Sequence, residues 1–94
     1  MLTLHKAAQA GTIESSDILV SIAPAPAGTG IQLDLVSQTM PQYGRHITAL
    51  ITGILKEQGV ADAMVQANDM GAIDLVIEAR VKTALGRAAA PAEQ

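Results

Sequence analysis

The spacing of apolar residues changes along this chain, and the change limits its fold more than any other feature. Over residues 17–23 and 31–36 apolar residues fall at every second position, as in half-buried strands: Ile18, Val20 and Ile22, then Ile31, Leu33 and Leu35. Over residues 43–55 they recur every three or four positions, as on one face of an amphipathic helix: Tyr43, Ile47, Leu50, Ile51, Ile54 and Leu55. A second helical stripe follows: Ile73, Val76, Ile77, Val81, Ala84 and Leu85. The chain must therefore pack strands and helices around a shared core.

Weaker signals complete the order of elements. Residues 6–14 and 63–68 are predicted as two further strands, and the Pro- and Gly-rich segment 24–30 as a loop. We place Pro41 in the first turn of the first helix, where a missing N–H costs nothing, and the end of that helix at Gly59. The order β-β-β-α-β-α predicts an α+β two-layer sandwich, in which an antiparallel or mixed four-stranded sheet carries two helices on one face.

The length of 94 residues fits a single domain, residues 1–94. We expect the ends, residues 1–5 and 89–94, to be mobile, and the small residues from Ala88 onward to be frayed. The second helix follows a turn at residues 68–71.

Composition argues against several classes of function. The chain has no cysteine, so it has neither a disulfide nor a thiolate of its own. The net charge is −3 and the six basic residues are scattered, which argues against nucleic acid as a partner. No apolar stretch approaches the ~20 residues needed to span a bilayer, and no basic leader precedes a long apolar run. We therefore expect a cytoplasmic protein that does not bind a membrane.

The segment 10–18 places two hydroxyl groups between two strand-like runs. Ser15 and Ser16 are flanked by Glu14 and Asp17, and two residues between extended segments is the length of a tight hairpin loop. We therefore expect both hydroxyls to be exposed at the tip of a hairpin. On the residues alone this is an ordinary loop, whose carboxylates are solvated or pair with basic groups on a partner.

Residues suited to catalysis or metal binding are few. His5 lies near the N-terminus and His46 lies beside Ile47 in the first predicted helix; with no cysteine and no close carboxylate pair at ligand spacing, we predict ordinary surface or boundary histidines and no metal site. A hydrolase that uses Ser15 or Ser16 with His46 is disfavoured, because Gly-x-Ser-x-Gly is absent and the flanking carboxylates oppose an alkoxide. We predict no catalytic residue.

Three segments, in this order and in a chain of this length, resemble the acyl carrier protein (gamma subunit) of citrate lyase. They are Ala10-Gly11-Thr12-Ile13-Glu14-Ser15-Ser16-Asp17, then Ile22-Ala23-Pro24, then Asn68-Asp69-Met70-Gly71-Ala72-Ile73-Asp74 before a helix with Ala79-Arg80. Each segment is short, but the three together are specific, and the resemblance covers nearly the whole chain.

This resemblance implies a non-catalytic carrier subunit. The family's modified serine falls at Ser15 and bears, through a phosphodiester, a 2'-(5''-phosphoribosyl)-3'-dephospho-coenzyme A group whose thiol holds acetyl. The alpha subunit exchanges acetyl for citryl, and the beta subunit cleaves the citryl thioester to oxaloacetate. The resemblance also implies a transferase that installs the group and a ligase that charges the thiol with acetate.

The sequence departs from the family pattern at Ser16, where a glycine usually follows the modified serine. If the turn requires a positive φ here, a residue other than glycine costs about 1–2 kcal/mol. Ser16 is also a second, less favoured candidate for attachment. Two other functions stay open: a carrier subunit of malonate decarboxylase, with a similar group on a similar serine, and a non-catalytic scaffold whose sheet or helix face binds a partner.

Overall fold

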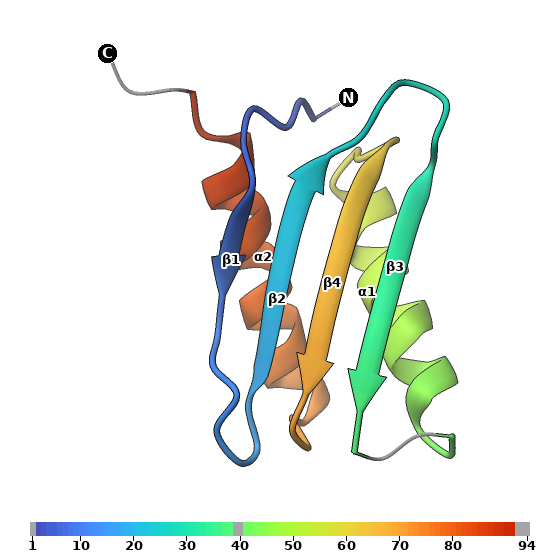
Figure 1. Ribbon diagram of the computed structural model, residues 1–94, viewed down its shortest axis with the longest axis vertical. Helices are drawn as coiled ribbons and strands as arrows, with labels where there is room; N and C mark the ends of the chain where they lie inside the picture. The colour runs from blue at the N-terminus through green and yellow to red at the C-terminus, as the bar shows by residue number, and fades with distance from the viewer. Residues whose placement is uncertain (1, 39–40, 92–94) are drawn as a thin grey trace.

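The computed structural model describes residues 2–38 and 41–91 (Figure 1). The described residues form four strands and two helices: β1 Ala8–Ala10, β2 Ile18–Pro24, β3 Ile31–Ser37, α1 Gly44–Glu57, β4 Ala63–Asp69 and α2 Asp74–Ala89. The predicted order β-β-β-α-β-α is confirmed.

The four strands form one mixed sheet. Its order is β1-β2-β4-β3, so β4 lies between two strands that precede it in the chain. β2 runs antiparallel to β1 and to β4, whereas β3 runs parallel to β4. A parallel pair needs a crossover connection, and α1 provides it. Val65 pairs with Ile22 on one side and with Leu33 on the other, which aligns the core-facing residues of three strands.

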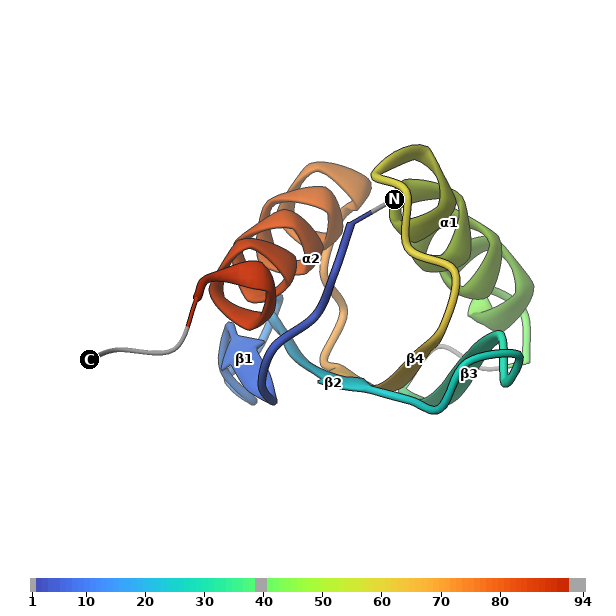
Figure 2. The same cartoon turned by 90° about the horizontal axis from the view of Figure 1, so that it is seen from above.

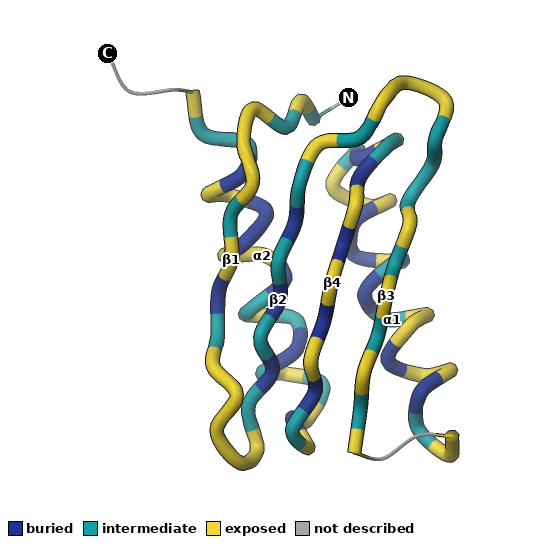
Figure 3. Tube along the Cα trace, viewed as in Figure 1, coloured by how far each residue is buried: buried dark blue, intermediate teal, exposed yellow. Residues whose placement is uncertain are grey.

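Both helices cover the same face of the sheet, as the end-on view shows (Figure 2). The side chains buried between the two layers are aliphatic, and the largest fully buried ones are Ile18, Ile22, Ile47, Ile51, Leu55 and Ile77. Along β4 buried and exposed residues alternate strictly (Figure 3), because successive side chains of a strand point to opposite faces. The predicted two-layer sandwich is therefore confirmed, and neither of the helices in the described residues covers the other face of the sheet.

Three predicted boundaries are wrong. The first strand covers Ala8–Ala10 rather than 6–14, because Gly11 has a φ of +93° and leaves the extended region; the connection to β2 therefore spans residues 11–17 instead of two residues. Pro41 precedes α1, in which Ile47 N makes an early backbone bond to Tyr43 O (3.1 Å).

The third wrong boundary is the C-terminal end of α2. Ala88 lies in the last turn of α2 and is fully buried rather than frayed. Its carbonyl accepts bonds from His5 N (2.8 Å) and Lys6 N (3.3 Å), and Leu2 N donates to Gly59 O (2.9 Å). The ends expected to be mobile include residues 1 and 92–94, which lie outside the described residues. Among the residues described, no helix has the length and apolar character that a membrane-spanning segment requires.

Candidate functional site in the serine loop

Residues 11–17, which we call the serine loop, join β1 to β2 at one end of the molecule (Figure 1). Asp17 N donates to Glu14 O (3.1 Å), which closes a four-residue turn with Ser15 and Ser16 at its centre. Of these two residues only Ser16 has a positive φ (68°), the pattern of a type II turn. Both serines are exposed, so the predicted exposure is confirmed although the loop is longer than predicted.

The serine loop is bonded to the connection between β4 and α2. Ser16 N donates to the carbonyl of Met70 (2.8 Å), and Met70 N donates to the carbonyl of Asp17 (2.9 Å). Within the loop, Glu14 N donates to Thr12 Oγ1 (3.1 Å). Backbone bonds of Ser16 and Asp17, the two residues after Ser15, hold the loop in place, and the side chain of Ser15 takes no part in them. Its hydroxyl is therefore presented on a defined backbone.

Gly11 fixes the start of the loop. Its φ is +93°, and a Cβ on this residue would lie 1.8 Å from the carbonyl oxygen of Ile18. No side chain fits at that distance, so the close approach of the two ends of the loop requires glycine.

Asp17 closes the loop by an ion pair with α2. Arg80 Nε lies 3.0 Å from Asp17 Oδ1 and Arg80 Nη2 lies 3.2 Å from Oδ2, a two-point contact. Thr12 Oγ1 (2.7 Å) and Ile18 N (2.7 Å) also donate to this carboxylate. Led by the Arg80 bond, these contacts lower the pKa of Asp17 to about 2. The prediction of a solvated or partner-binding Asp17 is wrong, whereas the neighbouring Glu14 is exposed.

A buried carboxylate supports the connection on which the loop rests. Asp69, at the end of β4, is 1% exposed. Its Oδ1 accepts from Ala72 N (2.9 Å) and its Oδ2 accepts from Ser37 Oγ (2.8 Å). These bonds satisfy the carboxylate and shape the turn that carries Met70. The turn predicted at residues 68–71 starts later than expected, because β4 continues to Asp69, and the burial of Asp69 was not predicted.

A second cluster of polar side chains joins the beginnings of the two helices. Tyr43 Oη donates to Asp74 Oδ1 (2.7 Å), and His46 Nε2 lies 2.7 Å from Asp74 Oδ2. The hydrogen bond from Tyr43, followed by that from His46, lowers the pKa of Asp74; the same carboxylate raises the pKa of Tyr43. His46 is exposed, as predicted, and so is His5. The pairing with Asp74 was missed, because no local motif joins residues so distant in sequence.

The structure gives no support to a hydrolase. His46 lies at the start of α1, which follows the edge strand β3, whereas the serine loop leaves the opposite edge of the sheet at β1. No hydrogen bond joins His46 to Ser15 or Ser16 within the described ranges. In residues 2–38 and 41–91, no group of three or more His, Cys, Asp or Glu side chains could hold a metal ion.

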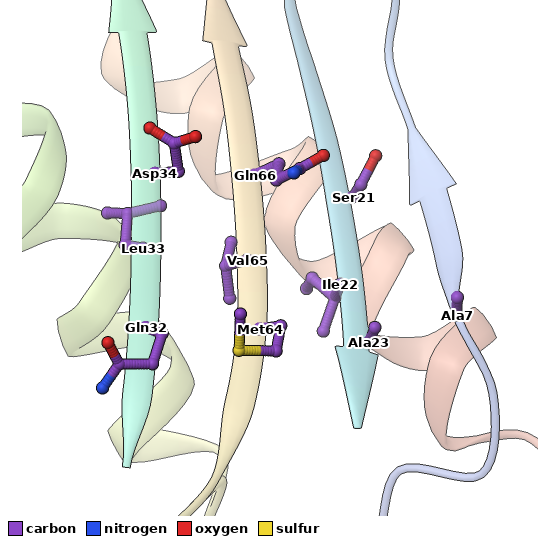
Figure 4. Close-up of a pocket in the computed structure, with 10 residues that line it drawn as sticks. All are labelled: Ala7, Ser21, Ile22, Ala23, Gln32, Leu33, Asp34, Met64, Val65 and Gln66. Carbon is purple, nitrogen blue, oxygen red and sulfur yellow. The ribbon is translucent and has the colours of Figure 1, made fainter. Parts of the chain in front are cut away.

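A pocket of about 530 Å³ lies on the open face of the sheet (Figure 4). It is lined by Ala7, Ser21, Ile22, Ala23, Gln32, Leu33, Asp34, Met64, Val65 and Gln66. Asp34 is the sole charged residue of this lining, so the pocket offers no cation to a phosphate. Its residues do not include the serine loop, and we regard the loop as the stronger candidate site.

Comparison with known proteins gives the family. A family model described as ACP, the malonate decarboxylase delta subunit (MdcD), matches residues 5–88. The citrate lyase acyl carrier protein of Halothermothrix orenii is 37% identical over 93 residues, which are 99% of this chain and 97% of the relative. That of Rhodopseudomonas palustris is 43% identical over 87 residues, 93% of this chain and 88% of the relative. These relatives are acyl carrier proteins, subunits that carry a group and do not themselves catalyse.

The chain belongs to the citrate lyase acyl carrier protein family. The resemblance and the carrier role inferred from the sequence are thereby confirmed. A chain in the crystal structure of a Pseudomonas malonate decarboxylase hetero-tetramer in complex with malonate shares the fold, with a TM-score of 0.64 at 19% identity over 87% of this chain and 82% of that one.

Proposed function

We propose that this chain is the acyl carrier subunit of citrate lyase and that Ser15 is its attachment residue. The observation that carries the proposal is the geometry of the serine loop. Ser15 is an exposed residue of a turn whose next two residues, Ser16 and Asp17, are bonded through their backbone to the connection after β4, while its own hydroxyl is not engaged in those bonds. Such a mount suits a side chain that several enzymes must reach in turn.

The attached group would be 2'-(5''-phosphoribosyl)-3'-dephospho-coenzyme A, joined to Ser15 Oγ by a phosphodiester. When bound, it supplies the thiol that the cysteine-free chain lacks, and that thiol carries acetyl or citryl. The chain's part is to hold the attachment oxygen outside the fold. Both serines are exposed, so a bulky substituent on Ser15 meets no buried surface at its point of attachment. A tethered thiol also acts at a high effective concentration in each active site.

The proposal implies a set of partners. The citrate lyase alpha and beta subunits would act on the carried acyl group to cleave citrate to acetate and oxaloacetate. A holo-forming transferase would modify Ser15, and a ligase would charge the thiol with acetate. We place all of these in the cytoplasm, with no nucleic acid or membrane as partner.

A carrier subunit of malonate decarboxylase is the second candidate, because the matching family model bears that description and the fold recurs in the Pseudomonas complex. The curated relatives favour citrate lyase, since they match at 37% and 43% identity whereas the solved structure matches at 19%. Adding the purified holo chain to carrier-free preparations of each enzyme separates the two. Restored citrate cleavage supports the first candidate, and restored malonate decarboxylation supports the second.

Intact mass tests the attachment. Protein from a host that holds the transferase should be heavier than the bare chain by the mass of the phosphoribosyl-dephospho-coenzyme A group. Ser15→Ala should abolish the increase, while Ser16→Ala should keep it. Loss in Ser16→Ala alone would move the attachment to Ser16. A bare wild-type chain beside an active transferase would favour the scaffold function instead.

A further inference from the structure

The end of the molecule that carries the serine loop also exposes large apolar side chains. Ile13 is 59% exposed, Ile73 65% and Leu75 73%. Ile13 belongs to the loop, Ile73 belongs to the connection whose Met70 exchanges backbone hydrogen bonds with the loop, and Leu75 follows that connection in α2. Figure 1 shows the loop and the start of α2 at the same end of the molecule. These three residues, the apolar rim, therefore lie at the end of the molecule that carries the residue proposed to be modified.

The side chains of the apolar rim are not part of the hydrophobic core. Ile73 precedes α2 in extended conformation and makes no side-chain cap. Leu75 lies in the first turn of α2, whose buried residues begin with Ile77. Single exposed apolar side chains are common, but a group of them beside a functional residue marks an interaction site.

We propose that the apolar rim is the docking surface for the transferase that attaches the prosthetic group to Ser15; this inference rests on the proposed function. In the transfer, Ser15 Oγ forms a bond to the phosphorus of a phosphoanhydride donor. The phosphorus–oxygen bond to the departing phosphate breaks, that phosphate leaves with the electron pair, and the hydroxyl proton passes to a base of the transferase.

Distance selects the transferase over the other partners. The reacting atoms must come within about 3–3.5 Å, so the transferase has to lie against this end of the unmodified chain. Enzymes that act on the thiol reach it at the far end of the attached group and need no contact with Ile13, Ile73 or Leu75. The occupant of the rim is therefore the enzyme that touches Ser15 itself.

The charged residues near Ser15 indicate which side chains the transferase surface should carry. Arg80 neutralises Asp17, whereas Glu14 is exposed and has no ion pair among the described residues. This end of the molecule thus offers exposed apolar side chains together with one carboxylate, that of Glu14, that has no ion pair among the described residues. It fits a transferase surface with apolar side chains around the active-site entrance and a Lys or Arg placed to meet Glu14.

Steady-state transfer to the purified chain tests the inference, with the transferase, the phosphoanhydride donor and intact mass as the readout. Ile13→Ser, Ile73→Ser and Leu75→Ser should each raise KM for the carrier about tenfold, the effect of removing an interface contact, and leave kcat nearly unchanged. Met64→Ser is the control, because Met64 is 49% exposed on β4 opposite Ala23, away from the loop. Its KM should equal that of the wild type.

The salt dependence of KM provides a measurement that does not depend on the variants of Ile13, Ile73 and Leu75. KM of the wild type should rise from low to high salt, and Glu14→Gln should weaken that dependence. Folded rim variants that keep the wild-type KM overturn the inference, as does a fall in kcat alone, which would mean that the rim shapes the loop. If the wild type accepts no group at Ser15, the proposed function itself fails.

Discussion

Ser16 has the one positive φ of a residue other than glycine among the described residues. At 68° this residue stands in the left-handed region, where a Cβ crowds the following carbonyl. We expect Ser16→Gly to raise the free energy of unfolding by about 1 kcal/mol, less than the full relief of strain because glycine adds freedom to the unfolded chain. Denaturant titration measures it. Ser15→Gly, at a residue without positive φ, should give no gain; an equal gain there would contradict the explanation.

Gly11 and Gly28 form a matched pair for a second prediction. Both have positive φ, +93° and +89°, but a Cβ on Gly11 would meet the Ile18 carbonyl at 1.8 Å while a Cβ on Gly28 meets nothing within 4 Å. Gly28→Ala should therefore cost about 1 kcal/mol, the conformational term alone, and Gly11→Ala should cost at least about 3 kcal/mol. Equal losses in thermal unfolding would show that the serine loop relaxes around the added methyl group.

At the scale of elements, the pair of Asp17 and Arg80 joins the serine loop to α2. The folded pKa of Asp17, about 2, lies below its ordinary value of 3.8, so the pair stabilises the fold above that value and loses its effect as pH falls toward 2. Asp17→Asn should lower the free energy of unfolding by about 1–2 kcal/mol near neutral pH.

The control for this prediction is pH itself. The difference between wild type and Asp17→Asn, followed by urea unfolding, should shrink between the ordinary and the folded pKa of Asp17 and vanish below the latter. A difference that does not change with pH would mean that the variant acts through the hydrogen bond from Thr12 and not through charge.

The contact between the starts of α1 and α2 has its own spectroscopic reporter. Tyr43 is the sole aromatic residue of the chain, so its ionisation can be followed by ultraviolet absorbance without overlap. Asp74 raises the pKa of Tyr43 above 10.0 by accepting its hydrogen bond. Asp74→Asn should return that pKa toward its ordinary value, and Asp34→Asn, on the open sheet face, should leave it raised. An unchanged titration in Asp74→Asn would exclude the contact in solution.

The spacing of apolar residues predicted the helices and strands that bury a regular stripe of side chains. It did not predict the bounds of a strand that has no such stripe. β2, β3, α1 and α2 were found because their apolar residues repeat with the period of the element. β1 consists of Ala8, Gln9 and Ala10, which carry little pattern, so its length was misjudged. The order of the strands in the sheet could not be predicted from the sequence either, because packing across the sheet decides that β4 lies between β2 and β3.

Some features of the candidate site could likewise be predicted from the sequence, and others could not. The exposure of Ser15 followed from local turn chemistry, and the role proposed for it rests on the resemblance. The bond from Arg80 to Asp17 joins residues 63 positions apart, and no local motif encodes such a contact. The sequence predicted strain at Ser16 if the turn required a positive φ there, and the observed φ of 68° meets that condition.

For the whole molecule, the two faces of the sheet should respond differently to mutation. Val65 and Met64 are neighbours on β4, but Val65 is 1% exposed beneath the helices and Met64 is 49% exposed on the open face. Val65→Ala should cost about 2 kcal/mol through lost burial and a residual cavity, whereas Met64→Ala should stay within about 0.5 kcal/mol. Comparable losses would mean that another surface covers the open face in solution.

The central position of β4 has a consequence for biosynthesis. The ribosome releases this strand after β1, β2 and β3, yet the sheet order places it between two of them. Until Met70 emerges, the turn around Ser16 lacks the backbone bonds that complete its shape. An enzyme that recognises that shape would pass over nascent or truncated chains and modify those whose synthesis has gone beyond the last strand.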